Sequence, residues 1–511
     1  MDRKVMPEQP GFYLPQKVCV ADLIIYCCFR RNLRISLFIA EQRKKSADCK
    51  KIFPAFYRSS DFMEQMKWIV LSVAVIMYVL VIVFQKKKVW FTTGAAVLIV
   101  ITGCIFPGAI FSLPETSSSS KLFLHTYAFT HTALEIINWN VILIYLGSMI
   151  IAALFIYSKV PARIADAIVA SFKNTGLAMT AILVITGIIS MFVENVATVL
   201  VMAPVALAMC RKLEINPATF MIGLAVMSNL EGTATLVGDP PSIIFASYAG
   251  YTFIDFFFHQ GKFSIFWIVQ AGLLTGCIYF FIRFSSCGKN SLRPKKTQVV
   301  SYVPLWLLLA MIFGLAALSF IPNCPPFSGG IFVLATGLFG LVWYCFRKKD
   351  ADASAISLVK ELDWETIFFL PGIFTVIGAI QETGLLNDFA QVLSGITGGS
   401  KLAGFIMIIA VSVIISGFVD NVPYIMAMLP VVREMVLSMN ASPELFMFAL
   451  LTGSCLGGNL TPFGASANIV AMGIVRKQGY EMKFSKWLTT GVPFTILTTA
   501  AAAAVLWLIW A

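Results

Sequence analysis

Two pairs of polar residues stand inside long apolar stretches of the sequence. Glu194 is followed by Asn195 and Asp420 by Asn421, and both pairs have apolar neighbours on each side. A carboxylate in the middle of a membrane span costs roughly 2.5–3.5 kcal/mol on insertion scales, so such residues usually mark an ion or proton pathway. Carboxylate and amide oxygens bind hard cations, and a carboxyl group can also carry a proton. These four residues are our candidates for a Na⁺ site.

A structural role is the alternative for both pairs. If each pair lies at the tip of a helical hairpin, its acid and amide can accept hydrogen bonds from the first N–H groups of the returning helix. The residues would then be helix caps and would hold no ion.

A second kind of interruption occurs in residues 229–242 and 457–468. The first segment places two glycines, two prolines, two threonines and two carboxylates inside one hydrophobic stretch, and the second keeps glycines and hydroxyls without charge. Broken helix ends point N–H groups at an anion and C=O groups at a cation, although a plain kink or gating hinge is the alternative. The further candidates for substrate or ion binding are Thr198, Asn229, Glu231, Gly232, Thr233, Thr235, Gly238, Asp239, Pro240, Ser242, Gly458, Asn459, Thr461, Gly464, Ser466 and Asn468.

The charges of these segments indicate the kind of ligand. No apolar span has an arginine or lysine in its middle, whereas Glu194, Glu231, Asp239 and Asp420 bring up to four carboxylates toward one centre. That excess favours a cation as substrate or coupling ion. Clustered carboxylates also raise one another's proton affinity, so proton coupling fits as well as sodium coupling.

The interruptions belong to an internal repeat. Residues 189–196 recur as residues 415–422, an offset of 226, with six of eight positions identical. The same offset aligns the glycines and threonines of the two broken segments, and Trp139 and Trp364 open matching spans at an offset of 225. Each repeat is predicted to run span, amphipathic linker, hairpin, broken span.

The composition places these repeats in a membrane. Of 511 residues, 58% are hydrophobic and only 13% are charged, with a mean hydropathy of +0.84. These values exclude soluble enzymes and nucleic-acid readers. We predict an all-α polytopic protein with two re-entrant hairpins, at 177–209 and 402–432, and about ten spans. The spans are placed at 68–84, 89–110, 137–157, 218–250 (broken), 264–283, 303–321, 326–346, 364–384, 443–475 (broken) and 486–510.

Basic residues predict the orientation of the two repeats. With Lys86, Lys87 and Lys88 taken as cytoplasmic, the other basic loops also lie inside only if both hairpins return to their own side. The repeats then have inverted topology. We divide the chain into a basic leader (1–62), a first repeat (63–286), a basic cytoplasmic linker (287–302) and a second repeat (303–511). The scheme places the leader outside, against the charge bias. Three alternatives remain for it: it is interfacial, it adds a further crossing, or it is not part of the native protein.

Residues 192–198, 232–241, 418–423 and 464–468 resemble a branch of the ion-transporter superfamily. That branch holds arsenite-efflux permeases, NhaD-type sodium/proton antiporters, the melanosomal P protein and citrate-type transporters. The resemblance covers residues 68 to about 510 and implies two inverted repeats, ion-coupled transport and, often, homodimers. Glu194 departs from the usual aspartate of P-protein-like members, and Glu231 from a common glycine. Either change can alter ion choice.

Three functions follow as hypotheses. The first is a secondary active transporter that moves a small inorganic or organic anion with Na⁺ or H⁺ across the inner (cytoplasmic) membrane. The second is a Na⁺/H⁺ antiporter, and the third is a passive anion channel of the same fold. An enzyme is not expected, because the chain has three histidines and no HExxH, GxSxG or Walker motif. The expected partners are the anion, the coupling ion and the lipid bilayer, with no cofactor and no nucleic acid.

Overall fold

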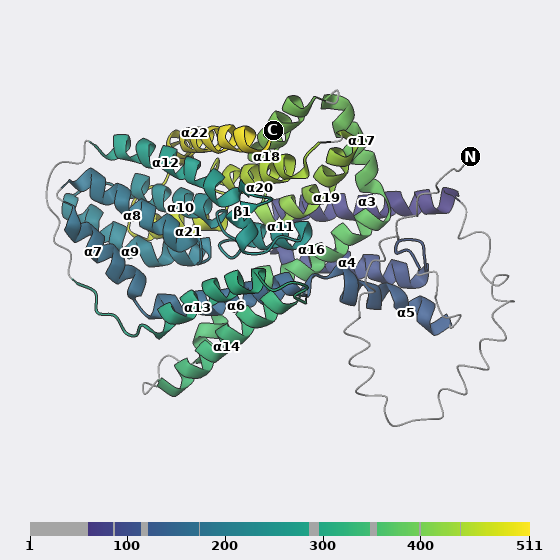
Figure 1. Cartoon of the computed structure of the whole chain (residues 1–511), viewed down its shortest axis with the longest axis horizontal. Helices are drawn as coiled ribbons and strands as arrows, with labels where there is room; N and C mark the ends of the chain where they lie inside the picture. The colour runs from purple at the N-terminus through teal and green to yellow at the C-terminus, as the bar shows by residue number, and fades with distance from the viewer. Residues whose placement is uncertain are drawn as a thin grey trace, which may run out of the picture.

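The computed structural model describes residues 60–84, 87–113, 121–172, 174–285, 296–325, 327–347, 355–397, 400–439 and 441–511. These residues form an elongated bundle of helices (Figure 1). The predicted leader lies outside the described residues except for its last three, with which the first helix begins. Of the predicted linker, only residues 296–302 are described.

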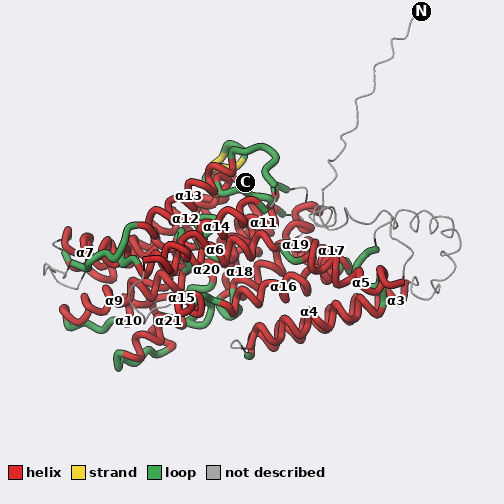
Figure 2. The backbone as a smooth tube through the Cα atoms, turned by 90° about the horizontal axis from the view of Figure 1, so that it is seen from below, coloured by secondary structure: helices red, strands yellow, loops and turns green. Residues whose placement is uncertain are grey.

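The helices in chain order are α3 (Ser60–Val83), α4 (Lys88–Ile105), α5 (Lys121–His131), the π-helix η5 (Thr132–Ile136), α6 (Trp139–Tyr157), α7 (Val160–Ser171), α8 (Thr175–Ser190), α9 (Asn195–Leu213), α10 (Ala218–Gly232), α11 (Pro240–Ala249), the 3₁₀ helix η6 (Ile254–Phe256), α12 (Ile265–Phe284), α13 (Val303–Ser319), α14 (Ser328–Arg347), α15 (Ala355–Lys360), α16 (Trp364–Glu382), α17 (Leu385–Thr397), α18 (Lys401–Ser416), α19 (Asn421–Met439), α20 (Pro443–Gly457), α21 (Ser466–Lys477) and α22 (Phe484–Trp510). A short antiparallel pair, β1 (Phe258–His259) and β2 (Lys262–Phe263), is yellow at one edge of Figure 2.

The two predicted hairpins are present as helix pairs. Helices α8 and α9 are joined by the turn 191–194, and α18 and α19 by the turn 417–420. The two predicted broken spans are likewise each two helices, α10 with α11 and α20 with α21. The helices from α6 to α11 therefore have the same order as those from α16 to α21, as the repeat predicted.

Eight helices in the described ranges are long and apolar enough to cross a membrane. Seven of them are predicted spans. The eighth is α9, which we predicted as the second arm of a hairpin. Of the other three predicted spans, α13 has 17 residues and falls just short, and two are the broken pairs.

Helices of each half of the chain pack against helices of the other half. Helix α6 of the first half packs on α14 of the second, and α16 of the second half packs on α4 of the first. In the same way α21 packs against α9, and α11 against α19, while α12 and α22 pack on each other. Each half thus supplies helices to the surroundings of the other's hairpin, and the hairpin tips and helix breaks meet in the middle.

Helix caps with the repeat's spacing begin the matching spans. The Asn138 side chain accepts a hydrogen bond from the Val141 N–H at the start of α6. The Asp363 side chain accepts one from the Thr366 N–H at the start of α16. Such caps satisfy an N–H group that has no partner within the helix.

Candidate functional site

A serine anchors each hairpin tip to the broken helix behind it. In the first half, the Ser190 hydroxyl donates to Asn195 Oδ1 and lies 2.7 Å from the hydroxyl of Ser228 in α10. In the second half, the Ser416 hydroxyl contacts Asn421 Oδ1 and the backbone oxygen of Ser454 in α20. All these contacts are buried, so the position of each asparagine is fixed by its neighbours.

The turns between the broken helices also repeat the same contacts. The Thr235 hydroxyl donates to the Met191 carbonyl, and the Thr461 hydroxyl donates to the Gly417 carbonyl. Glycine is needed behind them, because a Cβ added to Gly464 would lie 2.6 Å from the Gly458 oxygen. The turn in each broken helix is therefore hydrogen-bonded to the hairpin tip of its own half.

Three buried asparagines join the two breaks to each other. Asn229 Nδ2 donates to Asn459 Oδ1 at 2.8 Å and to Asn468 Oδ1 at 2.9 Å. Asn468 in turn donates to the carbonyls of Gly458 and Thr461. Asn229 Oδ1 has no partner among the described residues. This amide cluster holds α10 against the start of α21.

A cavity of about 50 Å³ lies where these elements converge. At about 10–15 Å³ for each water, it has room for an ion with a few water molecules. The first residues of α9, α11, α19 and α21 all line it, so the positive ends of four helices face one space. Its lining residues are Lys88, Tyr145, Glu194, Asn195, Val196, Asn229, Asp239, Pro240, Pro241, Asp363, Thr366, Asp420, Asn421, Val422, Ala465, Ser466 and Ala467.

Carboxylates dominate the charge of this lining. Three stand where helices begin: Glu194 accepts from the Ala197 N–H at 3.0 Å, Asp420 from the Val422 N–H at 3.1 Å, and Asp363 caps α16. Asp239 precedes α11 and makes no capping bond. The Tyr145 hydroxyl also donates to Asp363 at 3.1 Å.

Lys88 supplies the one basic side chain in the lining. Its ammonium nitrogen lies 3.0 Å from Asp420 Oδ2, and 13% of its side chain is exposed, compared with 32% for Asp420. The sequence analysis assigned Lys88 to a cytoplasmic loop, but its amine lies in the cavity. Sequence reasoning also did not select Asp363 as a site residue, although it stands directly before the repeated Trp364.

Glu231 lies apart from the other predicted acids. Its carboxylate accepts a hydrogen bond from Gln270 of α12 at 2.9 Å, its Oε1 has no partner among the described residues, and it does not line the cavity. The predicted residues that line the cavity are Glu194, Asn195, Asn229, Asp239, Pro240, Asp420, Asn421 and Ser466. Those outside its lining are Thr198, Glu231, Gly232, Thr233, Thr235, Gly238, Ser242, Gly458, Asn459, Thr461, Gly464 and Asn468.

Comparisons with known proteins find relatives over most of the chain. A family described as citrate transporter (CitMHS) matches residues 78–453 and 353–511. The uncharacterized transporter Rv2684 of Mycobacterium tuberculosis is 30% identical over 424 residues, which cover 80% of this chain and 93% of that protein. The human P protein is 24% identical over 61% of this chain and 46% of its own length.

A solved structure has a similar fold. The YdaH transporter of Alcanivorax borkumensis superposes with a TM-score of 0.54, covering 81% of this chain and 97% of that one. Sequence identity is 14%, so the likeness concerns the fold alone. The resemblance seen in the sequence motifs is confirmed by these comparisons.

Proposed function

The chain belongs to the CitMHS citrate transporter family, and on that premise we propose that it couples Na⁺ or H⁺ to the movement of a small anion. It is a multi-pass membrane transporter and not an enzyme. The proposed location is the cytoplasmic membrane. The central cavity is the proposed site for both the coupling cation and the anion.

A difference between the two broken helices carries this proposal. Helix α11 follows Asp239 and begins with Pro240 and Pro241, so the acid stands beside two residues that have no N–H group. At the equivalent place, α21 follows Ala465, has no side-chain cap, and begins with Ser466. One break thus offers a carboxylate, and the other offers N–H groups and a hydroxyl.

These two ends suit opposite charges. Backbone N–H groups at a helix N-terminus attract an anion, and at α21 no acidic side chain at the cap opposes it. The anion would bind there beside the Ser466 hydroxyl. The cation would bind among the carboxylates of Glu194, Asp239 and Asp420, which line the same cavity.

The shared cavity supplies the coupling. With four carboxylates and one lysine in the lining, an anion entering an unloaded site meets net negative charge. Binding Na⁺ or protons reduces that negative charge, so the anion should bind better after the cation than before it. Its substrate would be a small carboxylate or inorganic anion, and the family description favours a citrate-type carboxylate.

Thermal unfolding of the purified full chain tests this proposal. We expect one anion among citrate, succinate, sulfate, arsenite and chloride to raise the unfolding temperature only when sodium or low pH supplies the cation. Ala465→Asp should abolish the anion effect, because it places a carboxylate at the start of α21, and should retain the cation effect. Ser485→Asp, which adds the same charge at an exposed position outside the cavity lining, is the control. Loss of neither effect in Ala465→Asp would overturn the anion assignment.

The excess of carboxylates also favours a second candidate, a Na⁺/H⁺ antiporter without an anionic substrate. Reconstituted vesicles separate the two functions. A sodium gradient that changes the internal pH with no added anion would identify the antiporter. Anion flux that follows voltage without dependence on Na⁺ or pH would instead identify a passive channel.

A further inference from the structure

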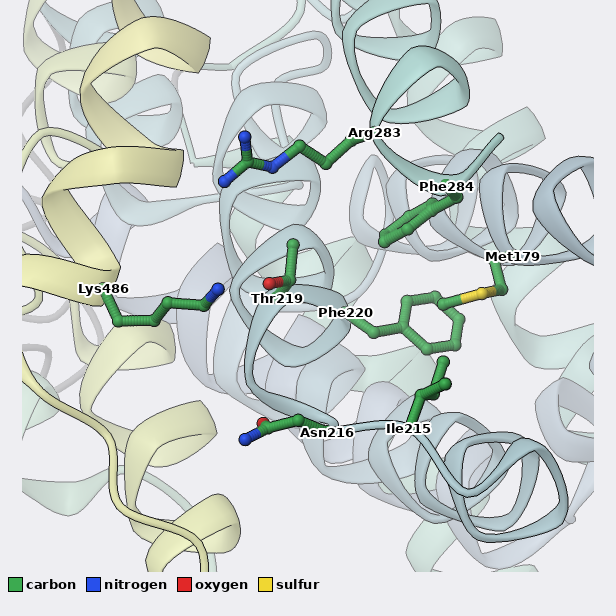
Figure 3. Close-up of a pocket in the computed structure, with 8 residues that line it drawn as sticks. All are labelled: Met179, Ile215, Asn216, Thr219, Phe220, Arg283, Phe284 and Lys486. Atoms are coloured by element: carbon green, nitrogen blue, oxygen red, sulfur yellow. The ribbon is translucent and has the colours of Figure 1, made fainter. Parts of the chain in front are cut away.

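A second cavity, of about 340 Å³, lies among α8, α10, α12 and α22 (Figure 3). It shares no lining residue with the central cavity. One part of its lining is apolar, with Met179, Ile215, Phe220 and Phe284. Phe220 and Phe284 are buried and meet edge to face at 5.6 Å between ring centroids. The cavity therefore has a firm apolar wall.

The other part of the lining is polar and basic. Figure 3 shows Lys486 extending from α22 and Arg283 from α12 toward the same space, with the Thr219 hydroxyl between them and Asn216 on the far side of Lys486. Both cations are exposed. Neither forms an ion pair within the part of the chain that the structure describes. Two uncompensated positive charges from different helices thus converge on one space.

Exposed apolar side chains stand next to the lining residues in sequence. Ile282, directly before Arg283, is 66% exposed, and Ile278 one turn earlier is 62% exposed. On α22, Phe484 is 48% exposed two residues before Lys486. In a membrane such exposed apolar side chains at the ends of spans contact acyl chains, so we expect hydrocarbon at the mouth of the cavity.

We propose that this cavity binds an anionic membrane phospholipid, with the phosphodiester group between Arg283 and Lys486 and hydrocarbon beside the aromatic wall. Guanidinium and ammonium groups both form charge-assisted hydrogen bonds to phosphate oxygens. Basic pockets between transmembrane helices are a known form of lipid headgroup recognition. Because α12 and α22 pack on each other, a lipid held by both would stabilise their contact.

Thermal unfolding with added lipid tests the proposal. The full chain in neutral detergent is titrated with phosphatidylglycerol, with phosphatidylcholine, and with inorganic phosphate. We expect phosphatidylglycerol to raise the unfolding temperature at low mole fraction and the other two to have little effect. At about fivefold in affinity for each basic side chain, Arg283→Gln with Lys486→Gln should weaken the apparent lipid affinity about 25-fold.

Matched variants keep the test decisive. Arg476→Gln with Lys483→Gln removes the same charge at exposed positions outside the cavity lining and should keep the lipid response. Arg283→Lys with Lys486→Arg keeps both charges and should also keep it, which guards against misfolding of the neutral variant. An equal response to phosphatidylcholine, a full response to phosphate alone, or an equal loss in the control pair would overturn the proposal.

Discussion

Lys88 and Asp420 set the electrostatics of the cavity at the scale of single residues. Their 3.0 Å ion pair joins positions 332 apart in sequence and is only partly exposed. A coupling cation that binds Asp420 must therefore share that carboxylate with the lysine or replace it. Under the proposed function, Lys88 competes with the coupling ion for Asp420.

This competition predicts the behaviour of Lys88→Gln. Without sodium, the variant should unfold at a lower temperature, because Asp420 loses a charged hydrogen bond of about 1.5–3 kcal/mol. Added Na⁺ should raise its unfolding temperature more than that of the wild type, because the carboxylate is free. Adding Asp420→Asn to Lys88→Gln should recover part of the stability and remove the extra sodium response. Equal sodium responses in Lys88→Gln and the wild type would contradict the competition.

Neutralising Glu194 and neutralising Asp420 are predicted to change transport in different ways. Glu194 lines the cavity with no basic partner among the described residues, whereas Asp420 is paired with the ammonium group of Lys88. Glu194→Gln should flatten the pH dependence of transport and leave some Na⁺ stimulation. Asp420→Asn should weaken the Na⁺ dependence at every pH. Sodium titrations of transport at two pH values measure both. Wild-type flux with reduced thermal stability in both variants would mean that the acids are only helix caps.

Sequence reasoning found the parts of the site that lie on local motifs. The pairs Glu194–Asn195 and Asp420–Asn421 were visible because each puts charge inside an apolar run, and the structure places all four in one cavity lining. Lys88 could not be found in this way. It looks like one of three loop lysines, and only long-range packing of α4 against α16 brings it to the site.

At the scale of elements, hydropathy predicted most helices but not how the extra helix α5 is held. His131 in α5 contacts Glu382 at the end of α16 at 2.8 Å and Glu135 at 3.0 Å. Ser112 donates to Glu382 through both its N–H group and its hydroxyl. The hydrogen bond to Glu382 raises the pKa of His131 above its ordinary value near 6.5. Protonated His131 therefore attaches α5 to the second half.

That attachment predicts a pH-dependent stability. Because the folded-state pKa of His131 is raised, its contribution is fully present below about pH 6.5 and is lost as the pH rises through the folded-state value. The unfolding temperature of the wild type should fall between pH 6 and pH 8.5 by about 2 °C more than that of His131→Gln. His125→Gln is the control, because His125 contacts the backbone carbonyl of Cys104 and no carboxylate. Parallel pH profiles for the wild type and His131→Gln would contradict the prediction.

At the scale of the whole molecule, the main feature is that helices of each half pack against helices of the other. The internal repeat, with an offset of 226 residues between its copies, predicted two equivalent sets of elements. The contacts of Thr235 and Thr461 with their own hairpin tips recur at the same offset. The sequence did not predict that α4 packs on α16 and α14 on α6. Nothing in the local sequence identifies which helices pack together, because any apolar helix face can cover another. This packing makes both halves necessary for one cavity.

Opposite orientation of the halves across the membrane is the last prediction. Basic residues near Arg283 and Arg476 favour one side, and the hairpins must then return to their own sides. Cys210 is only 2% exposed, so introduced cysteines at Arg211 and Arg433, which are both exposed, are the better probes. In a background without native cysteines, an impermeant thiol reagent should label Arg211→Cys only from the cytoplasmic side and Arg433→Cys only from the other side. Arg476→Cys should label with Arg211→Cys and serves as the reference. Labelling of Arg211→Cys and Arg433→Cys from the same side would mean that the two halves have the same orientation in the membrane. The two halves would then not be related by inversion, and another arrangement would have to bring both hairpin tips to one cavity.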